Sequence, residues 1–367
     1  MPHSAPPSPR AGRLRAGVAA LCGVLALAGA AVPAAAAPPS GAVLLLYHRF
    51  GESRYPATNI RLEQFEHHLA VLRRPEYRVL PVPEIVAALR QGRPLPKRTV
   101  GITIDDAYAS VYTEAWPRLR RAGLPFTVFV ATDPVDRGFR DMMSWDQLRK
   151  MVLGGGVTIG HHTAGHLHMP DHDEARNRAE LAQAGERLAA ELHGWRPTLF
   201  AYPYGEYSLA VRRLVEGGGF AAAFGQHSGV AWAGEDRFAL PRFALNEHYG
   251  APERFDLVVE ALPLPVSDVS PAEVLLDGAP NPPRLAFTVG DAVERLAELR
   301  CYGSGRGAIP LHRAGRRVEV RPEAPFGAGR TRINCTAPGP EGRWHWWGRQ
   351  FYRPDAPGPG AAPRGSP

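Results

Sequence analysis

The chain has 367 residues, a length that suits one large domain with an appendage, or two domains. With 44% hydrophobic and 22% charged residues, the composition excludes a mainly disordered chain. The net charge of +7 includes no Lys/Arg-rich block of the nucleic-acid-binding type, so we expect no nucleic-acid partner.

The N-terminal segment has the pattern of an export signal. Arg10, Arg13 and Arg15 precede an uncharged stretch, residues 16–37, which ends in a run of small Ala residues. We expect residues 1–36 to be removed, leaving an exported periplasmic or extracellular protein without a stable membrane span. An uncleaved membrane anchor is the alternative, because the stretch is close to the ~20 residues that span a bilayer.

From residue 38 the chain alternates strands and helices. Apolar and β-branched runs predict buried strands at 42–47, 99–104, 125–131, 157–159, 198–202, 220–224 and 238–243. Apolar residues at helical spacing predict helices around 62–72, 111–119, 145–152, 181–192 and 211–215. Repeated strand–helix units predict an α/β fold, a (β/α) barrel of about seven strands over residues 38–262. Active sites of such folds lie at the carboxyl ends of the strands.

The rest of the chain changes character. Residues 263–283 are rich in proline and are interpreted as a linker, and short alternating segments over 284–353 predict a small all-β domain. Residues 354–367 are expected to be disordered. Cys301 and Cys335 remain after removal of the signal, and an oxidising compartment would let them pair. Two buried free thiols are the alternative.

Two carboxylates directly follow the strand predicted at 99–104. Asp105 and Asp106 are neighbours in sequence, and both remain ionised comfortably only if a cation compensates them. A divalent metal bound to one would leave the other free as a base. The pair alone is weak evidence, because Asp-Asp is also common in turns and helix N-caps.

Two later strand ends also carry polar motifs. Five histidines lie within residues 161–172. His162 and His166 are four residues apart, which places both imidazoles on one face of a turn or helix and suits a divalent ion. A purely structural histidine pair is the alternative. The turn Pro203-Tyr204-Gly205 is tight enough to free the Tyr204 amide as an oxyanion donor.

Together these motifs resemble a known family. They are Asp105-Asp106, His162-Thr163-x-x-His166 and Pro203-Tyr204-Gly205, with Tyr47-His48 on the first strand. Over about residues 42–262 the chain is similar to the polysaccharide deacetylases of carbohydrate esterase family four, which share the NodB-homology domain. The run FAYPYGEYS, beginning at Phe200, looks most like the branch that acts on poly-β-1,6-N-acetylglucosamine.

The resemblance implies a metal-dependent hydrolase that removes N-acetyl groups from an N-acetylglucosamine-containing polysaccharide and releases acetate. It implies that Asp105 is the general base, that Tyr204 is the oxyanion donor, and that the metal ligands are Asp106, His162 and His166. Zinc is the default ion, while cobalt, nickel and iron also use such ligands. The implied partner is an acetylated amino-sugar polysaccharide, and the oligomeric state is not predicted.

The chain departs from the family pattern at several positions. The arginine that often precedes the Pro-Tyr turn is missing, and Arg242, at another predicted strand end, is our candidate for orienting the base. The family's late Leu-x-His motif has no exact copy, so His248 is our candidate general acid and His48 competes with it. Candidates for the sugar pocket are His48, Trp145 and Pro203, with plain core packing as the alternative for Trp145.

Two other function classes fit the same motifs. A metal-dependent O-acetyl esterase would use this site on another polysaccharide. A non-catalytic glycan-binding protein would not need Asp105, since binding requires no base. The aromatic residues within 344–352 suggest either an accessory glycan site or the core of a structural β domain, and aromatics on both strand faces favour the core.

Overall fold

The computed structural model describes residues 39–355. The predicted signal peptide and nearly all of the tail predicted to be disordered lie outside this range. Within residues 39–355, no helix combines the length and hydropathy needed to cross a bilayer.

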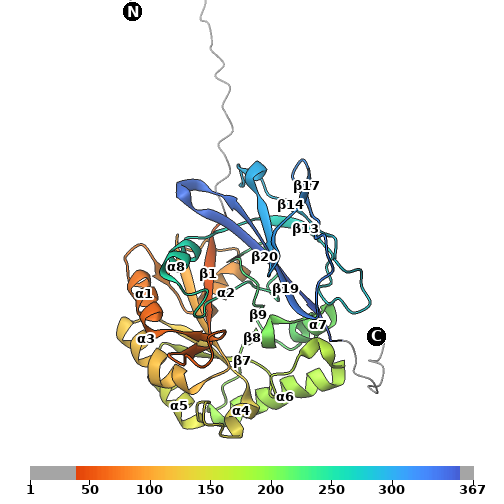
Figure 1. Cartoon of the computed structure of the whole chain (residues 1–367). Coiled ribbons are helices and arrows are strands. Elements are labelled where there is room, and N and C mark those ends of the chain that lie inside the picture. Colours follow the sequence, from red (N-terminus) through yellow and green to blue (C-terminus); the bar gives the residue numbers. More distant parts are fainter. Residues whose placement is uncertain (1–38, 356–367) are drawn as a thin grey trace, which may run out of the picture. The chain divides into compact units, whose positions relative to one another are not determined.

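A curled, mostly parallel sheet forms the first part of the structure (Figure 1). Seven strands follow its main path in the order β10-β1-β5-β6-β7-β8-β9, while β4 pairs with β5 and β11 with β1. The strands are β1 (Gly41–Tyr47), β4 (Arg78–Val79), β5 (Thr99–Asp105), β6 (Phe126–Val130), β7 (Val157–His161), β8 (Leu199–Ala201), β9 (Ala222–Phe224), β10 (Val230–Trp232) and β11 (Phe243–Ala244). Only β10 pairs antiparallel, with β1. This sheet confirms the predicted (β/α) barrel.

Helices cover the sheet, which explains why its central strands are continuous apolar runs. All seven residues of β5 are buried. The helices are α1 (Leu62–Leu72), α2 (Val82–Arg90), α3 (Trp116–Ala122), α4 (Thr132–Asp136), α5 (Trp145–Leu153), α6 (Glu174–Glu191), α7 (Leu209–Gly217) and α8 (Pro252–Val259). Figure 1 shows α1, α3, α5 and α6 around the outside of the strands. The strands β2 (Arg49–Phe50) and β3 (Asn59–Ile60) form a separate small pair.

Several elements differ from the sequence predictions. The helix predicted at 111–119 begins with a π-helical segment, Val111–Ala115, before α3. The strand predicted at 238–243 shortens to β11, because Pro241 has no N–H to continue a ladder. The helices α2, α4 and α8 and the strands β2, β3, β4 and β10 were not predicted.

Two antiparallel-rich sheets follow the barrel. One has the order β12-β20-β19-β15-β16 and the other β13-β14-β18-β17. Their strands are β12 (Leu262–Pro263), β13 (Val266–Ser270), β14 (Leu285–Val289), β15 (Arg300–Gly303), β16 (Gly307–Ile309), β17 (Leu311–Ala314), β18 (Arg317–Val320), β19 (Gly329–Pro338) and β20 (Trp344–Arg353). The segment interpreted as a linker thus contains β13. Cys301 and Cys335 form a disulfide between neighbouring strands β15 and β19.

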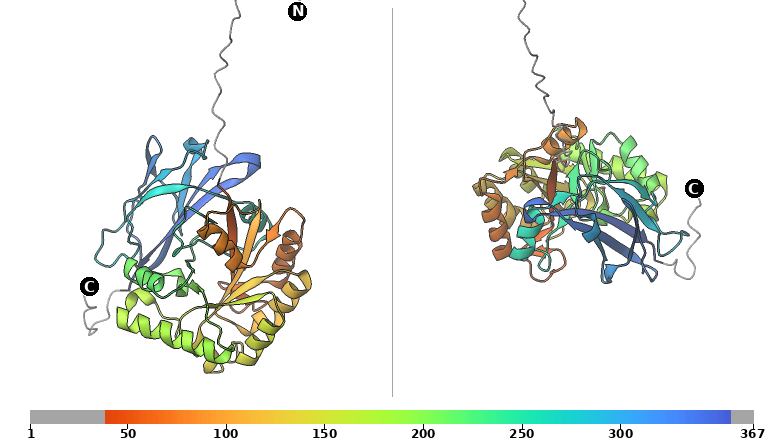
Figure 2. Two further views of the ribbon diagram at one scale, coloured as in Figure 1. Left: turned by 180° about the vertical axis from the view of Figure 1, so that it is seen from behind. Right: turned by 90° about the horizontal axis from the view of Figure 1, so that it is seen from above.

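The C-terminal sheets share packing with the barrel. Strand β12, which follows α8 directly, pairs in parallel with β20. Trp346 of β20 belongs to the barrel core and meets the ring of Phe243 edge-on at 5.2 Å. Trp347, on the other face, packs against Phe287 at 4.8 Å between ring centroids. Figure 2 shows β19 and β20, in dark blue, lying along the barrel when seen from behind.

Candidate active site

Asp105 ends β5 in a fully buried position beside Arg242. The Arg242 Nη1 and Nη2 atoms donate to the two Asp105 carboxylate oxygens at 2.7 and 2.8 Å. Arg242 is itself held by its Nε, which donates to the Gly225 carbonyl at 2.9 Å. Burial opposes ionisation of Asp105, but the Arg242 guanidinium brings the pKa of Asp105 below its usual value. The carboxylate is therefore ionised and held in one orientation by Arg242.

Asp106 faces two histidines instead of an arginine. The Nε2 atoms of His162 and His166 lie 3.3 and 3.2 Å from Asp106 Oδ1. One ligand atom from each of the three residues lies within 4.8 Å of the others. His166 is placed by the turn after β7, where its N–H donates to the Thr163 hydroxyl at 3.1 Å.

The donor set of these three residues fits a divalent cation. His162 Nδ1 donates to the Ala201 carbonyl at 2.7 Å, which leaves Nε2 unprotonated in the neutral ring. His162 Nε2 and Asp106 Oδ1 are buried and have no hydrogen-bond partner among the described residues. Buried polar atoms without a partner are costly, and a bound cation would satisfy both.

The other three histidines of the 161–172 cluster are engaged elsewhere or lie apart. His161 bonds to the Leu181 carbonyl at 3.0 Å, and His168 pairs with Glu206 at 2.6 Å. His172 belongs to no group that could hold a metal within the described part of the chain. The structure thus brings only His162 and His166 to Asp106.

The Tyr204 turn lies at the end of β8. Pro203–Gly205 forms one short 3-10 turn in which Tyr204 has a φ of 59°. No described residue accepts a hydrogen bond from the Tyr204 N–H. The Tyr204 carbonyl accepts bonds from Arg330 Nη1 and Gln350 Nε2, both at 3.2 Å. A turn held through its carbonyl, with an N–H that no described residue occupies, is compatible with the predicted oxyanion donor, which stays a prediction.

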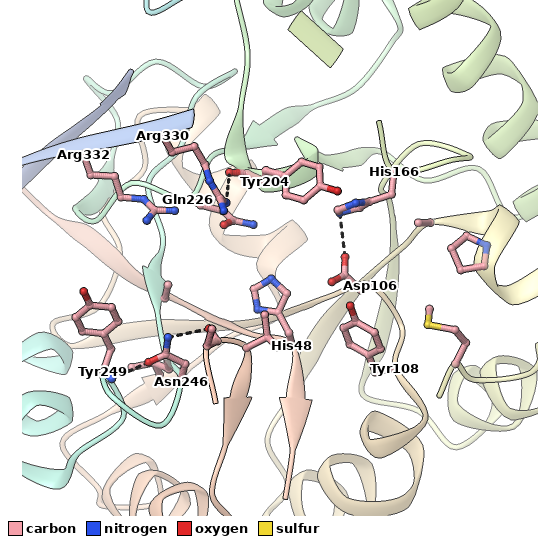
Figure 3. A pocket seen from close by; sticks show the side chains of 17 residues that line it. His48, Asp106, Tyr108, His166, Tyr204, Gln226, Asn246, Tyr249, Arg330 and Arg332 are labelled. Atoms are coloured by element: carbon pink, nitrogen blue, oxygen red, sulfur yellow. Dashed lines mark hydrogen bonds and ion pairs between the residues drawn. The ribbon is translucent and has the colours of Figure 1, made fainter. Parts of the chain in front are cut away.

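A cavity of about 420 Å³ opens above these groups (Figure 3). Its volume lies within the range of small-ligand sites. Its polar lining consists of His48, Thr58, Asp106, Tyr108, His166, Tyr204, Gln226, Asn246, Tyr249, Arg330 and Arg332. The cavity therefore joins the strand ends of the barrel to side chains of β19.

Comparison with known proteins identifies the barrel. Residues 92–223 match the family model described as polysaccharide deacetylase. Residues 92–223 therefore have the sequence pattern of a polysaccharide deacetylase domain. The chain is 24% identical over 203 residues to the putative polysaccharide deacetylase YxkH of Bacillus subtilis, covering 55% of this chain and 71% of that protein. It is also 24% identical over 203 residues to a poly-β-1,6-N-acetyl-D-glucosamine N-deacetylase of Staphylococcus aureus, covering 52% and 68%.

Solved structures share the fold of the deacetylase domain. IcaB from Ammonifex degensii is 27% identical, with a TM-score of 0.53, covering 59% of this chain and 98% of that one. The Streptococcus pyogenes deacetylase PplD has a TM-score of 0.56 at 21% identity, covering 60% and 99%. The family match and these neighbours support a deacetylase hydrolase.

The remaining predicted site residues separate into two groups. His48 follows β1 and lines the cavity of the deacetylase domain, where burial lowers the pKa of its ring. His248 is exposed and does not line the cavity. Pro203 is buried and does not line the cavity. Trp145 packs in the barrel core and donates through Nε1 to Asp136 at 2.7 Å. Of these four residues, the structure brings only His48 into the cavity.

Sequence reasoning missed the wall of the cavity. Arg330 and Arg332 come from β19, and Gln350, which holds the Tyr204 turn, comes from β20. The spacing of Arg330 and Arg332 shows that they share a strand face. No sequence signal indicated that this face meets the deacetylase domain. Tyr108, another lining residue, follows the Asp105-Asp106 pair closely and could have been suspected.

Proposed function

We propose that this protein is a metal-dependent N-deacetylase that releases acetate from an N-acetylglucosamine-containing polysaccharide. The observation that carries the proposal is that the two neighbouring carboxylates, Asp105 and Asp106, have different partners. Asp105 is held by Arg242, while Asp106 faces His162 and His166. We call Asp106, His162 and His166 the triad, and Asp105 does not belong to it. A protein that only binds glycans would need no such separate base.

The three triad residues would hold the metal in this proposal. A divalent cation supplies Lewis acidity toward the acetyl carbonyl when bound. We propose zinc, and cobalt, nickel and iron are compatible with the same donors of Asp106, His162 and His166.

The other residues move protons and stabilise charge. Asp105 accepts a proton from the attacking water, and Arg242 orients it. The Tyr204 N–H donates to the oxyanion that forms at the acetyl carbon. His48, the histidine in the cavity, protonates the leaving amine in place of His248. Because burial lowers the pKa of His48, the proton that it gives must first be taken up during the reaction.

The substrate and location are proposals of the same kind. The relative from Staphylococcus aureus is named for poly-β-1,6-N-acetylglucosamine, which supports an amino-sugar polymer as substrate. An acetylated polymer of this kind lies outside the cytoplasmic membrane, in agreement with the export signal expected in residues 1–36.

Acetate release separates the candidate functions. The full chain is incubated with poly-β-1,6-N-acetylglucosamine, with chitin oligomers and with O-acetylated xylan, each before and after chelation. We expect acetate from the N-acetylated polymers, loss of release after chelation, and recovery on adding zinc, cobalt, nickel or iron singly. Release from O-acetylated polymer alone would support the esterase alternative. Binding without acetate release in the metal-loaded protein would support the glycan-binding alternative.

A further inference from the structure

Two arginines enter the cavity from outside the barrel. Arg330 and Arg332 are two residues apart on β19, so both side chains leave the same face of that strand. Both line the cavity that Asp106 and His166 also line. Figure 3 shows the two arginines beside Tyr204 and Gln226, with Asp106 and His166 on the other side of the cavity.

Arg332 is held in place without a charge partner. Its Nε donates to Gln350 Oε1 at 2.9 Å. No carboxylate within the described range lies within ion-pair distance of it, and its two terminal nitrogens have no acceptor there. Burial and the neighbouring Arg330 charge lower the pKa of Arg332 to about 10, which still leaves it protonated at neutral pH. One nitrogen is thus fixed, while the others face the cavity with unused donors.

Arg330 is only partly compensated. Its Nε lies 3.6 Å from Glu206 Oε1, and Glu206 also pairs with His168 at 2.6 Å. One carboxylate therefore serves two cationic or potentially cationic partners, while Arg332 has none. The wall formed by β19 carries net positive charge.

The surroundings of the arginines add neutral polar groups. Asn246 and Tyr249, from the segment between β11 and α8, line the same part of the cavity. The Asn246 Oδ1 accepts bonds from the backbone N–H groups of His248 and Tyr249. Two like charges side by side in a partly buried wall are unfavourable unless a bound anion neutralises them.

We propose that Arg330 and Arg332 form an anion subsite for a carboxylate on the sugar next to the N-acetyl sugar that is deacetylated. Guanidinium groups match carboxylates in shape and hydrogen-bonding pattern. The preferred substrate is then an acidic amino-sugar polysaccharide, in which a carboxylate-bearing sugar alternates with an N-acetylated one. This inference rests on the proposed deacetylase function and narrows its substrate class.

Matched glycan pairs test the subsite in the full chain. One pair is a heparosan oligosaccharide, which carries uronic acid carboxylates, and the same oligosaccharide with its carboxyls reduced to alcohols. The other is a peptide-free peptidoglycan strand, which carries lactyl carboxylates, and its carboxyl-reduced form. For the pair whose linkage fits the site, we expect the carboxyl-reduced glycan to have a kcat/KM for acetate release that is about tenfold or more lower than that of the acidic glycan. The pair that responds identifies the source of the carboxylate.

Variants test whether the preference for the acidic glycan depends on the arginines of β19. In Arg332→Gln we expect the ratio of kcat/KM between acidic and reduced glycan to fall close to one. The matched control Arg321→Gln removes an equal charge from an exposed arginine that pairs with Glu319, and it should keep the wild-type ratio. A preference that survives in Arg332→Gln would overturn the assignment. If Arg332→Gln does not fold, the wild-type comparison of acidic and reduced glycans still decides.

Binding distinguishes failure of the subsite from failure of the deacetylase function. Calorimetry gives the Kd of each acidic and reduced glycan without requiring turnover. Absence of acetate release from every N-acetylated glycan would refute the deacetylase function. Equal Kd values within both pairs would refute the anion subsite, whether or not acetate is released.

Discussion

Asp105 and Asp106 are adjacent in sequence, yet their side chains have different neighbours. Replacing Asp105 by Asn removes the base but leaves all three triad residues unchanged. We expect turnover to fall roughly 10²–10⁴-fold while bound metal, measured by elemental analysis, stays at the wild-type level. Because buried Arg242 loses its charge partner, the variant should also unfold at a lower temperature.

The matched control for this change is Asp277→Asn. Asp277 is an exposed carboxylate in the segment between β13 and β14, and its substitution should leave turnover and metal content unchanged. Loss of metal from Asp105→Asn would contradict the separation of base from ligands.

The histidines give a second prediction at the scale of single residues. His162→Ala and His166→Ala should each lose metal and activity together, because each removes one of the three donors that the described residues offer. His168→Ala should keep its metal, because His168 pairs with Glu206 and not with Asp106. Elemental analysis after dialysis measures the metal. A metal-free His168→Ala protein with metal-bound His162→Ala would show that the choice among these histidines is wrong.

Residue spacing predicted some of these side chains and not others. Asp106, His162 and His166 were predictable because each follows an apolar strand run, and parallel strand ends meet at one edge. His248 was a weaker candidate, since its assignment rested on a near match to a motif after a segment without a regular strand. Arg332 could not be predicted, because strand periodicity gives the face of a residue and not the partner of that face.

At the scale of elements, the Tyr204 turn depends on Gly205. Gly205 has a φ of +70°, and a Cβ there would lie 2.4 Å from the Gln226 backbone nitrogen. We expect Gly205→Ala to lower the unfolding free energy by about 1–3 kcal/mol and to reduce kcat without loss of metal. Urea unfolding and acetate release measure the two effects.

Gly185 provides the matched control for that turn. It lies within α6, and a Cβ there would meet no atom within 4 Å. Gly185→Ala should raise the unfolding free energy by roughly 0.5–1 kcal/mol, since Ala favours a helix interior. Equal behaviour of the two variants would refute the role of the turn.

For the whole molecule, buried neutral histidines make stability depend on pH. Burial lowers the pKa of His68 and of His227 to about 3, and that of His161 to about 4. A depressed folded-state pKa gives stability that is present above pH 6.5 and is lost as the pH falls toward the folded value. As the pH falls from 6 to 4, these three histidines should together lower the unfolding free energy by up to about 4 kcal/mol per pH unit.

Urea unfolding at several pH values checks this expectation. The His68 ring accepts a bond from the Tyr47 hydroxyl at Nδ1 and donates from Nε2 to the Gly250 carbonyl, both at 3.0 Å. His68→Gln should therefore remove about one third of the histidine contribution to the pH slope. Glu235 acts in the opposite direction, because burial raises its pKa to about 7. A slope that is the same with and without His68 would contradict the assignment.

Removal of the C-terminal sheets tests how the barrel depends on them. Truncation after residue 283 deletes Trp346 from the barrel core and β20 from its pairing with β12. We expect the truncated barrel to unfold or aggregate, as judged by circular dichroism and size-exclusion chromatography. A stable truncated barrel that still cleaves short oligomers but no longer binds long polymer would instead favour an accessory glycan site.

The contact between Gln350 and the Tyr204 turn has a consequence for biosynthesis. Gln350 lies 146 residues after Tyr204 in the chain, and its side chain donates to the carbonyls of Tyr204 and Gly205. A ribosome or a translocation channel releases the barrel long before it releases β20. In the proposed mechanism, the nascent protein therefore passes through a stage in which Asp106, His162 and His166 are present but the Tyr204 turn is not yet held by Gln350. We then expect catalysis to begin only when the last strand is in place.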